Sequence, residues 1–102
     1  MTPASPAAAE GAAARSCRPV VNPYPGTRYE GEDLKRIRAT GVSCRRARRV
    51  ARRANRAALG LPRPLTGVRR FDWNGWRVTG DLRGDTDRYV ARRDGKRVRW
   101  RF

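Results

Sequence analysis

Residues 43–59, SCRRARRVARRANRAAL, predict an amphipathic helix around which the rest of the chain can be interpreted. Ser43 suits the N-cap, Gly60 suits the position after the last turn, and Pro62 follows just beyond. At about 100° per residue, the small apolar side chains share one arc and the arginines share the other. The apolar arc contains Cys44, Ala47, Val50, Ala51, Ala54, Ala57 and Ala58. Its alanines would let the helix approach a sheet closely. Because the stretch has no acidic residue, its arginines repel one another, and packing, a disulfide or an anion has to hold the helix.

Two β-hairpins are predicted beyond the Pro-rich linker at residues 61–66. Asn74-Gly75 stands between two alternating runs and suits a two-residue type I′ turn, and Asp94-Gly95 gives a second turn signal. The alternation of apolar and polar residues has the period of a half-buried strand. It predicts the opposed pairs Phe71–Val78, Trp73–Trp76, Tyr89–Trp100 and Ala91–Val98.

These elements predict a small α+β domain in which one amphipathic helix packs on an antiparallel sheet of C-terminal hairpins. Residues 34–39 are expected to form a short strand or a turn of helix, after an irregular segment at 17–31 that is punctuated by Pro and Gly. The expected core contains Ile37, Val42, Ala47, Val50, Ala54, Phe71, Val78, Tyr89, Val98 and Trp100.

The first 16 residues differ in composition from the rest of the chain. They are rich in Ala and Pro, and we expect residues 1–16 to be disordered and residues 17–102 to form a single basic domain. They lack the charged start and apolar stretch of an intact signal peptide. No apolar run is long enough to predict a transmembrane helix.

The charge of the chain predicts an anionic partner. Lys and Arg number 25 against 9 Asp and Glu, a net charge of +16, and almost all of the basic residues are arginine. Such a potential attracts nucleic acid, anionic lipid or acidic cell-wall polymer. An alternative explanation is that a GC-rich genome favours Arg, Ala, Gly and Pro codons. Two basic faces are predicted, with Arg92 opposite Arg97 and Arg88 opposite Arg101 on the hairpin. The candidate polyanion-binding residues are Arg45, Arg48, Arg49, Arg52, Arg53 and Arg56 on the helix and Arg88, Arg92, Arg97, Arg99 and Arg101 on the hairpin.

Other kinds of site have little basis in the sequence. There is no histidine, which removes the commonest general base and the commonest metal ligand. We therefore expect no catalytic residues, no metal site and no cofactor. Asp81, Asp85 and Asp87 are expected to neutralise nearby arginines. Trp73 and Trp76 are candidates for stacking on a ligand, although a small core also needs such bulk.

One segment resembles a known group of proteins. Residues 37–50 match an I-x-A-x-x-V-S-C-x-x-A-x-x-V run that recurs at a helix start in small secreted proteins of high-GC Gram-positive bacteria. That group has no assigned activity, and the resemblance implies export. From the residues alone, Cys17 and Cys44 are either a disulfide or two free thiols, and the resemblance favours the disulfide. Relatives often carry a second cysteine pair where this chain has Val78 and Ala91, so an apolar contact is expected there.

The resulting functional hypothesis is a monomeric, non-catalytic accessory protein, secreted or at the cell envelope. Its basic surface would engage an anionic polymer, either cell-wall polymer or nucleic acid, without specificity. The alternative is a cytoplasmic nucleic-acid-binding protein in which the arginine-rich helix contacts backbone phosphate. The thiol state separates the two, because free thiols are the rule in the cytoplasm.

Overall fold

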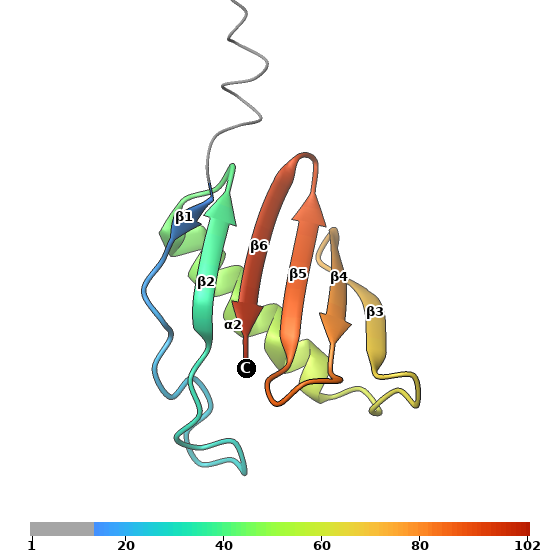
Figure 1. The fold of residues 1–102 in the computed structure, drawn as a ribbon. Helices are drawn as coiled ribbons and strands as arrows, with labels where there is room; N and C mark the ends of the chain where they lie inside the picture. The colour runs from blue at the N-terminus through green and yellow to red at the C-terminus, as the bar shows by residue number, and fades with distance from the viewer. Residues whose placement is uncertain (1–13) are drawn as a thin grey trace, which may run out of the picture.

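One helix packs on a six-stranded antiparallel sheet in the computed structural model, which describes residues 14–102. The α+β architecture predicted from the sequence is therefore confirmed. The strand order across the sheet is β1-β2-β6-β5-β4-β3. Figure 1 shows α2 behind the sheet, so that one face of the sheet is covered and the other is not. The elements are β1 (Arg15–Ser16), β2 (Lys35–Thr40), α2 (Cys44–Leu59), β3 (Val68–Trp73), β4 (Trp76–Asp81), β5 (Arg88–Arg93) and β6 (Lys96–Arg101).

The helix begins and the hairpins pair as local sequence signals indicate. The Ser43 hydroxyl caps α2 by accepting a hydrogen bond from the Arg46 backbone N–H at 3.2 Å. Asn74 and Asp94 adopt positive φ at their turns, each followed by a glycine that does the same. All four opposed pairs predicted for the hairpins are present in the register: Phe71–Val78, Trp73–Trp76, Tyr89–Trp100 and Ala91–Val98.

The core lies between α2 and the covered face of the sheet. Four helix alanines, Ala47, Ala51, Ala54 and Ala58, are fully buried, which brings the helix close to the strands. Eight of the ten expected core residues are buried, while Val42 and Phe71 are partly buried and pack against the core. Val78 and Ala91, the expected apolar pair, lie directly opposite each other on β4 and β5 and are both buried.

An aromatic stack fills the centre of the sheet's covered face. Tyr89 and Trp100 stack with ring centroids 5.3 Å apart and an interplanar angle of 14°. The Tyr89 ring occupies the space where a side chain at Gly80 would lie. A Cβ built on Gly80 would be 2.5 Å from a ring carbon. Burial raises the pKa of the Tyr89 phenol, so the ring stays neutral in the core.

Strand β2 completes the sheet from the other end of the chain. It pairs with β6, which settles residues 34–39 as mostly strand. The register shifts between Lys35 and Arg38, so that Arg36 and Ile37 together oppose one residue of β6, and Arg36 takes a positive φ of 55°. On the outer side of β2, Arg15 and Ser16 form β1, so the expectation of disorder is wrong for these two residues. Backbone pairing with β2 orders them; residues 1–13 of the segment lie outside the described residues.

A disulfide joins Cys17 to Cys44, as the resemblance implied, with Cα atoms 5.4 Å apart. It fastens the segment after β1 to the first turn of α2. The described chain has no free cysteine.

Two buried polar side chains, which the sequence analysis did not single out, fix α2 against the rest of the domain. Asn55 accepts a hydrogen bond from Trp100 Nε1 at 3.1 Å and donates one to the Tyr24 hydroxyl at 3.2 Å. Arg69 donates through Nη1 to the Ala58 carbonyl at 2.7 Å, at the end of the helix where a cation is favoured. Both side chains hold structure together and are withdrawn from any ligand.

Candidate polyanion-binding surface

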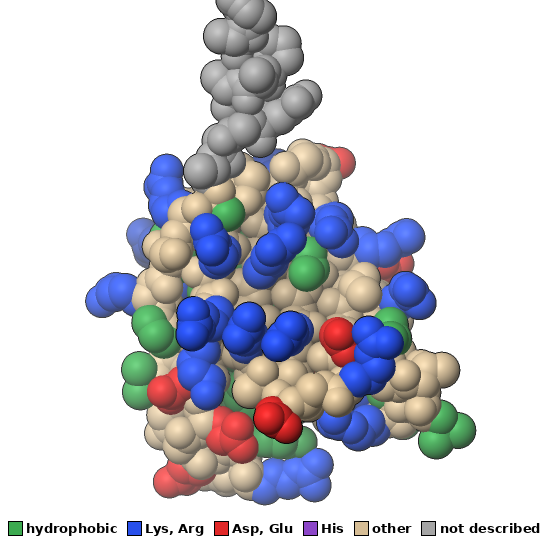
Figure 2. All heavy atoms as spheres, in the orientation of Figure 1, with side chains coloured by type: hydrophobic (Ala, Val, Ile, Leu, Met, Phe, Trp, Pro, Cys, Tyr) green, Lys and Arg blue, Asp and Glu red, His purple; other side chains and the backbone are tan. Residues whose placement is uncertain are grey.

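The uncovered side of the sheet, here called the open face, carries a dense set of arginines. Strand alternation sends Val98 and Trp100 toward the helix and their neighbours on β6 outward. The same alternation operates on β3, β4 and β5 and, beyond its bulge, on β2, and Figure 2 shows the resulting basic side chains across this face. The open-face arginines are Arg38 on β2, Arg97, Arg99 and Arg101 on β6, Arg88 and Arg92 on β5, Arg77 on β4 and Arg70 on β3.

Like charges stand directly opposite one another between these strands. Arg92 pairs with Arg97 on one side and with Arg77 on the other, and Arg88 pairs with Arg101. The two Arg pairs predicted within the last hairpin are therefore present. A further pair, Arg38 with Arg99, links β2 to β6. Opposed like charges destabilise a sheet, so this face gains free energy when an anion neutralises it.

Most of these arginines have no acidic partner within the described part of the chain. Among residues 14–102, the only open-face arginine with a carboxylate within 4.0 Å is Arg77, whose Nε lies 3.3 Å from Asp72 Oδ1. This pair is exposed on both sides and contributes little. Arg38 donates through Nη2 to the Ala14 carbonyl at 3.4 Å. The other guanidinium groups are available to an external phosphate, sulfate or carboxylate, for which the planar fork of arginine is well suited.

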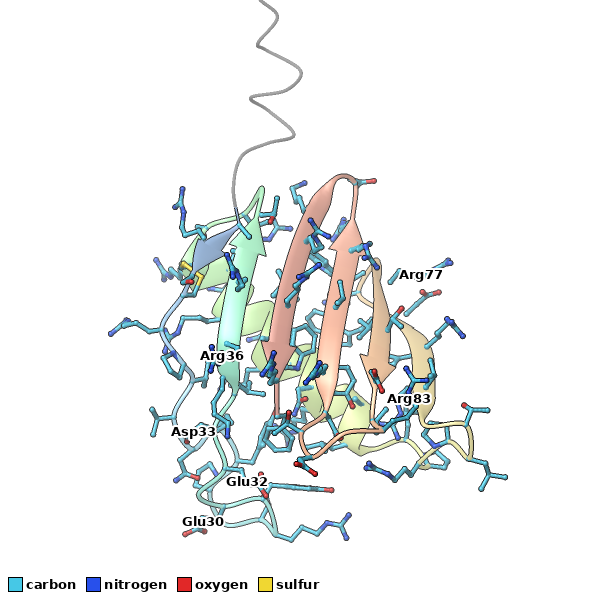
Figure 3. The ribbon with its side chains drawn as sticks, in the orientation of Figure 1. Glu30, Glu32, Asp33, Arg36, Arg77 and Arg83 are labelled. Atoms are coloured by element: carbon cyan, nitrogen blue, oxygen red, sulfur yellow. A yellow bond between two sulfur atoms is a disulfide. The ribbon has the colours of Figure 1, made fainter. Side chains whose placement is uncertain are left out.

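The β2 bulge adds one more arginine to the open face. Arg36 lines a hollow of about 330 Å³ together with four open-face arginines, and Val90 lies between them. Figure 3 labels Arg36 on β2 and Arg77 on the far side of the face. The other arginines lining the hollow are Arg38, Arg88, Arg99 and Arg101. The hollow thus gathers five guanidinium groups from three neighbouring strands.

Acidic side chains lie mainly in loops at the ends of the strands. Glu30, Glu32 and Asp33 occupy the loop before β2, at the lower left of Figure 3. Asp81 ends β4, and the guanidinium and backbone N–H of Arg83 hold its pKa well below the usual range, at about 2. Asp81 is therefore ionised and already paired, as predicted for this acidic segment.

Of the two other acidic residues in that segment, one has a basic partner and one does not. Asp87 lies 3.6 Å from Arg63, which agrees with the predicted neutralising role. Asp85 has no basic group within 4.0 Å among the described residues.

The helix arginines form a second basic face on the opposite side of the molecule. Arg48 is the exception, because it donates through Nε to the Arg18 carbonyl at 3.1 Å and through Nη2 to the Pro19 carbonyl at 3.2 Å. This predicted binding residue is half-buried and fastens the segment after Cys17 to the helix. The exposed helix arginines from the predicted set are Arg45, Arg49, Arg52, Arg53 and Arg56. The structure therefore keeps the two predicted arginine sets apart rather than joining them in one site.

The tryptophans are placed for packing. Trp76 is 2% exposed on the covered face, where the guanidinium of Arg46 lies 5.9 Å from its ring centroid, and Trp73 is half-buried beside it. The expectation that Trp76 is available for stacking is corrected by this burial, which follows from its position opposite Trp73 on the helix side. Across the described strands, no aromatic side chain alternates onto the open face, whose uncharged centre is Val90 and Thr79.

Some members of the open face were missed by the sequence analysis. Arg36 and Arg38 lie in a segment with few apolar residues, and their placement depends on a distant pairing with β6. Arg70 and Arg77 lie on the side of the first hairpin opposite to the pairs Phe71–Val78 and Trp73–Trp76, as strand alternation requires. Arg70 and Arg77 share one face with the arginines of the last hairpin because β4 pairs with β5. No local turn motif predicts that pairing.

No family model, curated protein or solved structure matches the chain. The resemblance of residues 37–50 to secreted proteins therefore stays a prediction. Among the described residues there is no group of three or more potential metal ligands. The helix in residues 14–102 is not long and apolar enough to cross a membrane.

Proposed function

We propose that the protein is a non-catalytic, secreted or cell-envelope accessory protein whose open face binds a phosphate-rich cell-wall polymer. The observation that carries the proposal is the density of arginines on the open face. Among residues 14–102, Arg77 is the only one of them with a carboxylate within 4.0 Å. Alternate residues on a strand are about 6.8 Å apart and neighbouring strands about 4.8 Å apart. A flexible chain of phosphates lying on this grid meets an arginine at short intervals in either direction.

The absence of rings on the described open face favours a polymer without bases. Proteins that bind single-stranded nucleic acid combine a basic groove with aromatic side chains on which the bases stack. Here the large aromatic rings, including Trp76, Tyr89 and Trp100, are buried under α2. Contacts through guanidinium groups alone suit a ligand that offers only anionic groups.

The disulfide and the amino-acid content support the other parts of the proposal. Structural disulfides persist in oxidising compartments, so the Cys17–Cys44 bridge supports a location outside the cytoplasm. The chain contains no histidine, and most acidic side chains of the described residues lie in loops at the strand ends. The two that the register places on the open face, Asp72 and Asp81, are paired with Arg77 and Arg83. These features favour binding over catalysis.

The test compares two triple variants that lose the same charge. Arg92→Gln/Arg99→Gln/Arg101→Gln removes three open-face arginines. The control, Arg15→Gln/Arg18→Gln/Arg28→Gln, removes three exposed arginines outside it. Binding of poly(glycerol phosphate), duplex DNA and single-stranded RNA is measured by fluorescence anisotropy across a salt series. We expect the plot of log K against log salt for poly(glycerol phosphate) to lose about 2–3 units of slope in the open-face variant, and less in the control.

Two outcomes would overturn the proposal. Equal losses in both triple variants would mean that net charge, and not the open face, governs binding. Tight binding of RNA or DNA at a salt concentration that abolishes poly(glycerol phosphate) binding would favour the nucleic-acid alternative, because contacts beyond phosphate would then exist.

A further inference from the structure

The second basic face, on the exposed side of α2, has a geometry of its own. Its arginines recur along the helix from Arg45 to Arg56, a distance of about 16 Å at 1.5 Å per residue. The helix contains no Asp or Glu. None of its arginines has a carboxylate within 4.0 Å among the described residues. This face is therefore a continuous line of unneutralised positive charge. We call it the helix face, with members Arg45, Arg49, Arg52, Arg53 and Arg56.

The helix face and the open face point away from each other because the molecule has two layers (Figure 1). Packed layers lie about 10 Å apart, and the arginine side chains add to that distance on both sides. The separation exceeds the screening length of about 8 Å at physiological ionic strength. An anionic chain bound to one face therefore repels a chain on the other face only weakly, and both faces can be occupied together.

The lower end of the molecule in Figure 3 limits wrapping by a single chain. The loop with Glu30, Glu32 and Asp33 presents negative charge below the sheet, and Asp85 and Asp87 lie in the loop between β4 and β5. A polymer leaving the open face in that direction meets carboxylates before it reaches the helix face. Two separate chains satisfy the two faces at lower electrostatic cost than one chain bent around this end.

We infer that one molecule of this protein cross-links two strands of anionic cell-wall polymer, one on the open face and one on the helix face. The inference extends the proposed function, since it takes the open face as one of the two sites. It adds a second site for the same chemistry and an activity, polymer bridging, that neither face has alone.

The experiment measures bridging and binding separately. Two pools of poly(glycerol phosphate), one labelled with a donor and one with an acceptor dye, are mixed with the protein. Energy transfer reports bridging, and anisotropy of a single labelled pool reports binding. We expect transfer to rise with the parent protein, to peak near charge balance and to fall in excess polymer, when each chain binds its own protein molecules.

Variants assign the bridging to the two faces. The open-face triple variant and a helix-face counterpart, Arg49→Gln/Arg53→Gln/Arg56→Gln, each keep one intact face. Each is expected to bind polymer with reduced affinity and to lose at least three quarters of the energy transfer at equal occupancy. The edge variant Arg15→Gln/Arg18→Gln/Arg28→Gln has the same charge loss and should keep most of the transfer.

Mixing the two single-face variants provides the decisive control. If both faces have to belong to one molecule, the mixture stays without transfer. Transfer restored in the mixture would mean that protein molecules associate with one another, and it would overturn the inference. Binding by the parent without transfer at any ratio would also overturn it while leaving the proposed function intact, whereas loss of binding itself would defeat the proposed function.

Discussion

Removing the disulfide should cost this small domain a large part of its stability. Cys17 and Cys44 are 27 residues apart in the sequence, and the bridge restricts the loop between them in the unfolded chain. For a loop of that length the chain-entropy contribution is about 3.5 kcal/mol. A small domain is typically stable by roughly 5–15 kcal/mol in total, so the loss is severe. Both cysteines are only partly buried, although Cys17 packs against the core, so most of the loss is expected from the unfolded chain.

The variant Cys17→Ser/Cys44→Ser isolates this effect without leaving a lone thiol. We expect its free energy of unfolding in urea to fall by about 3.5 kcal/mol, and its melting temperature by roughly 14–28 °C for a domain of this size. Reduction of the parent protein should give the same shift, and the reductant should leave the double variant unchanged. A loss below about 1 kcal/mol would refute the reasoning, because the segment between the cysteines would then be restricted in the unfolded chain by other means.

Two further predictions concern packing and ionisation. Gly80→Ala should destabilise the fold by about 1–3 kcal/mol in urea unfolding, because its Cβ would meet the locked Tyr89 ring at 2.5 Å. Gly84→Ala, whose Cβ would lie 3.8 Å from the Thr86 carbonyl oxygen, is the matched control, and an equal cost at both sites would contradict this explanation. The pKa of Asp81 is about 2, below its ordinary 3.8, so its stabilising contribution is present above pH 3.8 and is lost as the pH falls through about 2. In a carboxyl NMR titration, Arg83→Gln should move that pKa back toward 3.8; an unshifted value in the parent would disprove the pairing.

The elements that depend on neighbouring residues could be predicted from the sequence. The helix has the small-residue arc and the Ser43 cap, and each hairpin has an Asn-Gly or Asp-Gly turn between alternating runs. These signals depend only on residues close in the sequence, so they can be recognised without knowing the rest of the fold. The same alternation predicted which arginines of the last hairpin share a face.

What the sequence could not predict arises from distant partners. The position of β2 beside β6 joins residues about 60 apart, and the bulge that adds Arg36 to the open face exists only in that pairing. Asn55 and Arg69 look like ordinary surface polar residues until tertiary contacts bury them. Arg48 belongs to the exposed arc by helical period, but the segment after Cys17 covers it and takes up its hydrogen bonds.

Chemical-shift mapping of polymer binding tests the central claim most directly. Val90 lies among the open-face arginines, and Val98 lies on the adjacent strand but is fully buried toward α2. In a titration with poly(glycerol phosphate), we predict saturable shifts of the Val90 methyls and of the Nε–H groups of Arg99 and Arg101, with the Val98 methyls nearly unchanged. Saturable binding that leaves Val90 and these arginine signals in place, and shifts other parts of the domain instead, would contradict the account.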